Sequence, residues 1–448
     1  GANGYDGTLT IDGKTSGGFV SVLEGATANM YENVTLQNWT SAGNACVVIM
    51  GSDSVFNMHG GVIEECSRAV MADSGTTFNM YGGEIRNREG SRGSGVHVFE
   101  ATFVMSGGTI SGCTANEGGG LYATNQSTIT ISGGTISGCS AGAGGGLYAT
   151  NSSTITINKG TISECTAGMG AGGGLYATNG STININSGTI SGCEAGAGGG
   201  LYADNSIVTI NNGTISECEA AINEGGGLYA TNSSKITITG GTISGCTAAE
   251  NGGGLYAANS SEIIISGGTI SGCTGLRGGG LYANNSTVTI TGGTISGCTA
   301  GAGGGLYVVG SPLNIKGGTI SECFVSDSGK GGGLFADQTT LTISGGTIKG
   351  NKAAYGGGVA LRDSRVKEEE PITNWTVVDN KAYKTKTGTG YVGGGIYLEN
   401  GSMNASAGSN RIYNNTADGH GADICLDGSS TIKLPNAANM GVKYHDSG

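Results

Sequence analysis

The cysteines are the residues whose type and spacing first suggest chemistry in this chain. Nine of the twelve recur every 25 to 28 residues. If each falls on one turn of a stacked repeat, neighbouring Cα atoms lie about 4.8 Å apart, within the range that a disulfide spans. The column could hold disulfides between neighbouring turns, or buried free thiols that act as small apolar groups. Its members are Cys113, Cys139, Cys165, Cys193, Cys218, Cys246, Cys273, Cys298 and Cys323.

Asparagines replace the cysteines at the same position of the last repeats. Asn351, Asn380 and Asn415 stand where the pattern would place a further cysteine. Stacked asparagines can hydrogen-bond to one another through their side-chain amides. We therefore expect one structural column, the Cys/Asn column, that faces inward. We expect no metal site, because the chain has no Cys-x-x-Cys spacing and only four histidines.

A second column consists of aromatic residues in the middle of a recurring GGGLYATN segment. The residues on either side of the aromatic position are apolar, and strand side chains alternate, so the ring should face outward to solvent. Stacking in register would place the rings about 4.8 Å apart. The rings could shield the sheet, or form a binding stripe for sugars or a partner. This Tyr stripe comprises Tyr122, Tyr148, Tyr176, Tyr202, Tyr229, Tyr256, Tyr282, Tyr307, Phe335 and Tyr397.

Residues suited to acid–base catalysis are scattered along the chain. Polysaccharide lyases and hydrolases need Asp, Glu, Lys or Arg gathered on one face. Asp204 and Asp337 are single acidic residues beside the Tyr stripe, several repeats apart. We therefore predict neither catalytic residues nor a cofactor. A row of outward Thr-x-Thr pairs resembles an ice-binding face, but Lys235 and Glu262 interrupt it.

Motifs for asparagine glycosylation recur at the turn that follows the tyrosines. In an Asn-x-Ser/Thr triplet the asparagine can carry a glycan if the host has the machinery. Glycans attached there would decorate a single edge of the stack. The candidate positions are Asn125, Asn151, Asn232, Asn259 and Asn285.

The elements that must position these columns are short strands. Each repeat contains GGTISGC, a loop of variable length, GGGLYATN, a tight turn and STITI. Thr, Ile and Tyr favour strands, and no 3.6-residue apolar period predicts a helix. Three strands in about 25 residues, joined by Gly, Asn and Ser turns, are typical of one turn of a parallel β-helix. We therefore predict an all-β, single-stranded parallel β-helix of about 15 turns.

The repeat also sets the expected domain boundaries. We predict an N-terminal cap at 1–20, a parallel β-helix at 21–415 and a C-terminal cap at 416–448. The most regular part is 107–351, and a charged insertion is expected at 362–370. Caps are expected because bare sheet edges invite further pairing. The loop after each cysteine varies most between repeats, and such loops often gather at the edge that binds partners.

Composition limits the classes of partner. The formal net charge of −12 disfavours nucleic acid and anionic membrane surfaces. The sequence contains no run of 18 apolar residues, so we expect no membrane insertion of this chain.

The GGTIS and GGG-[LIV]-Y units resemble the repeats of bacterial and archaeal adhesin-like surface proteins, which have a right-handed, pectate-lyase-like β-helix. They are also similar in pattern to polymorphic outer-membrane protein repeats, which pair GG-A-I with F-x-x-N. The counterparts here are GGTI at 107–110 and 133–136, and Y-x-x-N at 122–125 and 148–151. The resemblance implies a right-handed helix and an extracellular or surface-displayed protein.

Two non-catalytic functions are consistent with the sequence. An adhesin would bind glycans or cell-surface molecules through the Tyr stripe and the variable loop edge. A structural protein would instead assemble with copies of itself into a sheath, a surface layer or an extracellular filament. We expect adhesion, with self-assembly as the alternative.

Overall fold

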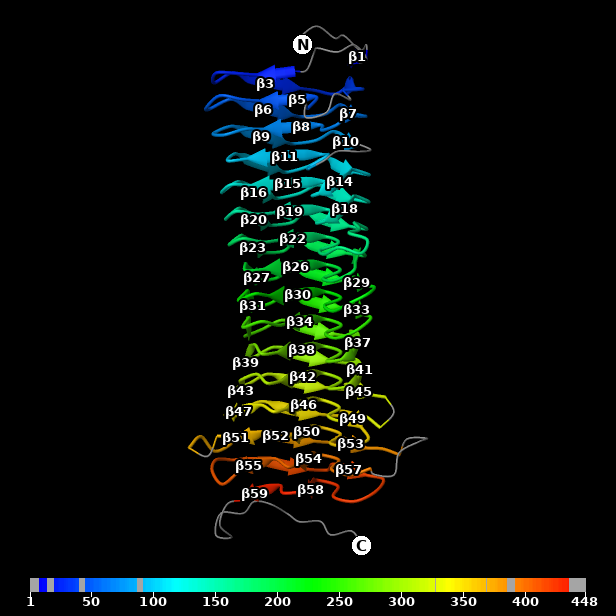
Figure 1. Cartoon of the computed structure of the whole chain (residues 1–448), viewed down its shortest axis with the longest axis vertical. Coiled ribbons are helices and arrows are strands. Elements are labelled where there is room, and N and C mark those ends of the chain that lie inside the picture. Colours follow the sequence, from blue (N-terminus) through cyan, green and yellow to red (C-terminus); the bar gives the residue numbers. More distant parts are fainter. Residues whose placement is uncertain are drawn as a thin grey trace. The chain divides into compact units, whose positions relative to one another are not determined.

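The computed structural model describes residues 8–13, 20–39, 45–86, 92–326, 328–367, 369–384 and 391–434. Within these ranges every regular element is a β-strand, and no helix could cross a membrane. The chain divides into two compact units, Gly1–Ile222 and Asn223–Gly448. Each unit is a parallel β-solenoid in which three strands complete a turn (Figure 1).

One turn of the first unit shows how the repeat folds. LYAT forms β15 (Leu121–Thr124) of sheet B, TITI forms β16 (Thr128–Ile131) of sheet C, and TIS forms β17 (Thr135–Ser137) of sheet A. Residues at the same repeat position therefore form columns at the strand spacing of about 4.8 Å. The three strands pair in register with β19 (Leu147–Ala149), β20 (Thr154–Ile157) and β21 (Thr161–Ser163).

The three sheets extend through the described part of each unit. Sheets B and C each have eight described strands in either unit, in agreement with the predicted number of turns. In the first unit, sheet A runs from β1 (Leu9–Asp12) to β28 (Thr214–Ser216). Sheet B runs from β2 (Val20–Val22) to β26 (Leu201–Asp204), and sheet C runs from β3 (Thr27–Met30) to β27 (Ile207–Ile210). In the second unit, sheet A runs from β32 (Thr242–Ser244) to β56 (Arg411–Tyr413). Sheet B runs from β30 (Leu228–Thr231) to β58 (Ile424–Asp427), and sheet C runs from β31 (Lys235–Ile238) to β59 (Thr431–Lys433).

A fourth, short sheet lies in the loops that follow the column cysteines, where we expected no strand. Its strands, of two to four residues, begin directly after the cysteine and pair with the equivalent loop one turn on. Runs this short carry no readable alternation, which is why the sequence does not predict them. Examples of this sheet D are β14 (Thr114–Glu117) and β18 (Ser140–Ala143), and β37 (Thr274–Arg277) and β41 (Thr299–Ala302).

Strands of the solenoid lie within both of the predicted caps. β1 lies within 1–20 and pairs with β4 (Val34–Gln37), while β58 and β59 lie within 416–448. Residues 1–7, 14–19 and 435–448 of the predicted caps lie outside the described residues. The predicted charged insertion 362–370 begins as solenoid strands, because β50 (Val359–Arg362) and β51 (Arg365–Val366) pair with the turn before them.

The core of each unit is built from the inward residues of the three sheets. In β16, Ile129 and Ile131 are fully buried, whereas Thr128 is exposed and Thr130 is half-buried. Burying an isoleucine side chain is worth about 1.5–3 kcal/mol. In strands such as β16 and β20, the alternation of Thr and Ile thus fixes which face points inward.

Candidate functional site

The nine cysteines of the Cys/Asn column lie inside the solenoid. All nine are buried free thiols, so the structure contains the free-thiol form of the two arrangements considered. Each Sγ atom lies 3.2–3.4 Å from the carbonyl oxygen of the serine two residues before it. A longer contact reaches the preceding turn, as between Cys139 Sγ and the carbonyl oxygen of Ile110 at 3.8 Å.

Hydrogen bonds between stacked thiols shift their pKa values in opposite directions along the column. Neighbouring thiols lower the pKa of Cys193 and of Cys273 to about 4. The hydrogen bond with Cys113, together with burial, raises the pKa of the Cys139 thiol well above its usual value. A protonated thiol is neither a nucleophile nor a metal ligand. Within the described residues, no group of three or more His, Cys, Asp or Glu side chains could hold a metal ion.

The asparagines continue the column in the second unit with stronger hydrogen bonds. The Asn351 backbone N–H and its Nδ2 atom both donate to Asn380 Oδ1, each at 2.9 Å. Asn380 repeats the pattern onto Asn415 Oδ1, at 3.0 and 2.9 Å. Asn351 and Asn380 are fully buried and Asn415 nearly so. Because every amide has its partners, this stretch satisfies the requirement for buried polar groups.

Asp423 ends the asparagine stretch, and sequence reasoning missed it. Its Oδ1 atom accepts hydrogen bonds from the Asn415 backbone N–H at 3.2 Å and from Asn415 Nδ2 at 2.9 Å. Asp423 stands where earlier repeats have the third glycine of GGG, since Ile424 pairs with Ile396. The change from GGG to GAD in this last repeat is the signal that could have identified it.

A disulfide between Cys46 and Cys66 also went unpredicted. Cys66 ends GGVIEEC, the counterpart of GGTISGC, and Cys46 stands at the third-glycine position before β5 (Val47–Ile49). Later turns have the same spatial pair without the bond: a Cβ atom on Gly120 would lie 3.2 Å from Cys139 Sγ. The two positions therefore face each other in successive repeats, and cysteine at both allows a covalent link.

Most neighbouring rings of the Tyr stripe stack face to face within each unit, whereas Tyr307 and Phe335 meet edge to face at 85°. In the first unit, Tyr148 lies 5.3 Å from Tyr122 and 4.9 Å from Tyr176, with interplanar angles of 13° and 6°. In the second unit, Tyr256 and Tyr282 are 5.3 Å apart at 2°. Inner rings such as Tyr148 and Tyr282 therefore have both faces occupied by their neighbours. A sugar ring needs a free aromatic face, so the interior of the stripe offers it only ring edges.

The stripe is also less exposed than the prediction of a solvent-facing row requires. Tyr122, Tyr282 and Tyr307 are only 6% exposed, and Phe335 and Tyr397 only 3%. In the second unit, side chains from the variable loops and adjoining strands pack against the rings and enclose them. Burial accordingly raises the pKa of Tyr307 to about 12. These neighbours include Ala302, Val309, Tyr355 and Val392.

Paired charges lie beside the rings. In the first unit the Arg92 guanidinium lies 5.8 Å from the Tyr122 ring centroid and pairs with Glu117 at 2.7 Å. In the second unit Arg362 lies 5.3 Å from the Phe335 centroid and pairs with Asp337. Asp337, a single acidic residue in the sequence, is thus a buried ion-pair partner. The arrangement favours a structural role for these charges over proton transfer.

The predicted glycosylation sites lie at the corner between sheets B and C. Asn151, Asn232, Asn259 and Asn285 are exposed and Asn125 is half-buried. All five have φ between 48° and 54°, the left-handed region that asparagine tolerates well. The Asn151 Nδ2 atom donates a hydrogen bond to Asn125 Oδ1 at 3.0 Å. A glycan on Asn151 would replace one of the two Nδ2 hydrogens and leave the other for this bond. Glycosylation stays a prediction.

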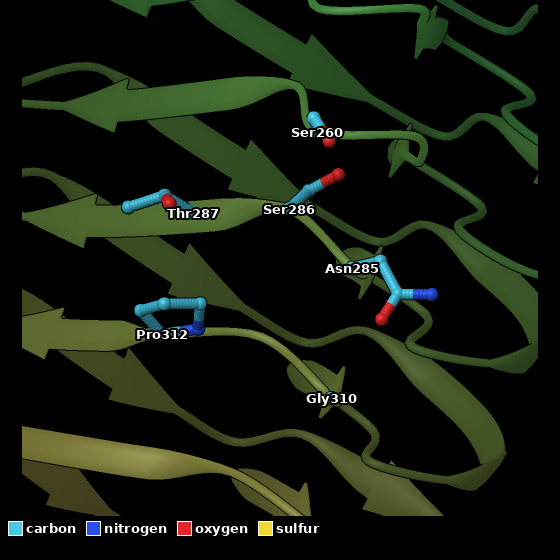
Figure 2. Close-up of a pocket in the computed structure, with 6 residues that line it drawn as sticks. All are labelled: Ser260, Asn285, Ser286, Thr287, Gly310 and Pro312. Carbon is cyan, nitrogen blue, oxygen red and sulfur yellow. The ribbon is translucent and has the colours of Figure 1, made fainter.

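A shallow hollow of about 340 Å³ opens at the same corner of the second unit (Figure 2). The close-up shows its lining residues on three successive turns. Hydroxyl and amide groups of this kind can hydrogen-bond to a ligand, whereas acid–base catalysis needs a titratable group. The lining residues are Ser260, Asn285, Ser286, Thr287, Gly310 and Pro312.

The loops of sheet D expose apolar side chains, and we call this face the variable edge. Of the five large apolar side chains exposed among the described residues of 107–351, four lie here. The fifth, Ile207, lies on sheet C. The varying length of these loops is plain in the sequence, but no pattern there singles out their exposed apolar residues. They are Met169, Ile222, Leu276 and Phe324, with exposed fractions of 87%, 48%, 50% and 38%.

A second aromatic stack, absent from our predictions, lies at the corner between sheets C and A of the first unit. His59 lies 4.9 Å from both Tyr31 and Tyr81, with interplanar angles of 8° and 15°. All three residues are exposed, unlike most of the Tyr stripe. We call them the aromatic corner. The sequence signal is the recurrence of Asn-Met-Tyr or Asn-Met-His at 29–31, 57–59 and 79–81.

Comparison with known proteins agrees with this architecture. The family model described as the right handed beta helix region matches residues 45–215, 173–315 and 269–438. No curated protein and no solved structure is significantly similar to the chain. The matched segments cover most of both units, and the chain therefore belongs to the family of right-handed β-helix proteins.

Proposed function

We propose that this chain is a non-catalytic, adhesin-like protein of the cell exterior that binds glycan or cell-surface partners along its variable edge. The observation that carries the proposal is the exposure of two large apolar side chains on the sheet D loops of each unit, Met169 and Ile222 in the first and Leu276 and Phe324 in the second. Apolar side chains that gather on one surface mark interaction sites more often than singly scattered ones do. The same loops vary in length while the three sheets stay constant, as expected of a scaffold that presents different contacts.

The Cys46–Cys66 disulfide supports placement outside the cytoplasm. Structural disulfides persist in secreted and surface proteins and are rare where thiols are kept reduced. The thiols of the Cys/Asn column do not contradict this, because all are buried away from oxidants. The non-catalytic part of the proposal is supported by the ion-paired state of Asp337 and by the hydroxyl and amide lining of the corner hollow.

Adhesion assays test the role of the variable edge. The double variant Met169→Ser with Leu276→Ser should reduce binding to intact cells or immobilised glycans at least tenfold. Ile207→Ser is the control, because Ile207 is an apolar residue on sheet C that is 46% exposed, close to the 50% of Leu276. Equal binding by the wild type and the double variant would remove the variable edge from the proposal.

Two further observations test the competing functions. Polymers of the purified chain seen by electron microscopy would favour the sheath, surface layer or filament. Release of products from acidic polysaccharides, with or without calcium, would overturn the non-catalytic assignment. A monomer that binds cells and leaves polysaccharides intact is the result that we expect.

A further inference from the structure

The aromatic corner ends at Tyr81 on an open ring face. The corner is in register from turn to turn, because the His59 and Tyr81 N–H groups each donate at 2.8 Å to a methionine carbonyl of the turn before. The Ser106 N–H continues the series at 2.9 Å. The position that would hold a fourth stacked ring is therefore occupied by serine. Tyr81 is 49% exposed, in keeping with a ring that has a neighbour on one face only.

The backbone beside Ser106 adds no side chain to cover the ring. Ser106 is followed by Gly107 and Gly108, and a Cβ atom on Gly107 would lie 2.3 Å from the Tyr81 carbonyl oxygen. Only glycine fits so close to the preceding turn. The space beside the free face of Tyr81 is therefore bordered by the backbone of Gly107 and Gly108, which have no side chains.

A ladder of asparagine amides runs beside the aromatic corner and ends at the same turn. Asn57 Nδ2 donates to Asn29 Oδ1, and Asn79 Nδ2 donates to Asn57 Oδ1, both at 2.9 Å. The next turn pairs Val104 with Asn79, and valine has no donor to continue the ladder. Within the described residues, the Oδ1 atom of Asn79 is therefore left as an open acceptor. Asn79 and Tyr81 are two residues apart, so they share the outward side of the strand end.

We propose that Tyr81 and Asn79 form a carbohydrate-binding site that takes one pyranose ring of a glycan. The apolar C–H face of the sugar would stack on the free face of Tyr81, in the place of the absent fourth ring. A sugar hydroxyl would donate to Asn79 Oδ1. A flat apolar face with hydroxyls at its rim is the ligand chemistry that an aromatic face beside an open amide oxygen matches. The inference goes beyond the proposed function, because it places a glycan-binding site on the aromatic corner, which is separate from the variable edge.

Saccharide titration of the full chain tests the site. The probes are cellohexaose, laminarihexaose and N-acetylchitohexaose, followed by calorimetry and by saturation-transfer NMR. At least one should bind the wild type, with sugar C–H resonances near Tyr81 shifted upfield. Tyr81→Phe keeps the ring face and should change the dissociation constant less than twofold. Tyr81→Ala should weaken binding at least tenfold.

Two further variants keep the test decisive if Tyr81→Ala fails to fold. Ser106→Tyr keeps Tyr81 but extends the stack into the proposed site, so it should weaken binding at least tenfold while the protein stays folded. Tyr148→Ala, which removes a ring of the Tyr stripe, should bind as the wild type does. The proposal is overturned if none of the three probes binds, or if Ser106→Tyr binds as well as the wild type.

The cell-adhesion assay separates this inference from the proposed function. If the wild type and Ser106→Tyr adhere equally and bind the saccharides equally, the site is wrong and the adhesin-like function stands. If the wild type binds a saccharide at Tyr81 but adheres to nothing, the site stands and the adhesin-like function falls.

Discussion

The backbone N–H of Cys323 donates a 2.9 Å hydrogen bond to Asn351 Oδ1, where the Cys/Asn column changes from thiols to amides. Asn351 Nδ2 in turn donates to the carbonyl oxygen of Ile320 at 3.1 Å. Cys323 Sγ makes the equivalent but longer contact, 3.9 Å, to the carbonyl oxygen of Ile295 one turn earlier. Amide and thiol thus have one structural role, and the amide forms the stronger bonds.

Exchange of residues along the column tests this equivalence. Cys298→Asn should change the free energy of unfolding by less than about 1 kcal/mol, because an amide can reach the carbonyl of Ile270 that the thiol already contacts. Asn380→Ala should lower it by about 2–4 kcal/mol, since the two Asn351 donors lose their acceptor. Urea unfolding followed by circular dichroism measures both. A larger loss for Cys298→Asn than for Asn380→Ala would contradict a shared role.

Thiol counting tests the column in another way. Alkylation of the unfolded, non-reduced chain should label ten cysteines, the nine of the column and Cys425, because only Cys46 and Cys66 are bonded. In the folded protein Cys425 should react first, since it alone among the free cysteines is partly exposed. Mass mapping gives both results. Labelling of fewer than ten sites would instead indicate disulfides between neighbouring turns.

Two glycines of one repeat should respond differently to alanine. A Cβ atom on Gly120 would lie 2.7 Å from the carbonyl oxygen of Gly146 and 3.2 Å from Cys139 Sγ, so Gly120→Ala requires the turn to move. Gly138, unlike Gly120, has a positive φ of 58°, but a Cβ atom there would meet nothing within 4 Å. We expect Gly138→Ala to cost about 1 kcal/mol and Gly120→Ala clearly more. Equal unfolding midpoints in urea would show that the third glycine is not sterically required.

The regular alternation of inward and outward residues, TIS in sheet A, LYA in sheet B and TITI in sheet C, made the three sheets predictable, because a period of two fixes which residues are buried. The direction of the Tyr stripe followed from the same rule, but its low exposure did not. Enclosing side chains such as Tyr355 and Val392 come from the variable loops, whose path no period encodes. The Cys46–Cys66 bond lay in repeats that have diverged, where Cys46 replaces a glycine.

His97 should make the first unit sensitive to acid. It occupies the stripe position one turn before Tyr122, at 90° to that ring, and neither ring nitrogen has a hydrogen-bond partner. Burial, followed by the charges of Arg68 and Arg92, lowers its pKa to about 3.

The pKa of His97 in the folded state lies below the unfolded value of about 6.5, so the unfolded chain binds a proton that the folded chain does not. The stability that depends on neutral His97 is therefore complete above pH 6.5 and is lost as the pH falls toward 3. His97→Phe keeps an aromatic ring against Tyr122 and removes the titrating group. The unfolding midpoint in urea should therefore fall between pH 7 and pH 4 more steeply for the wild type than for His97→Phe. Parallel pH profiles of the two proteins would show that His97 is already accessible to protons in the folded state, contrary to its buried geometry.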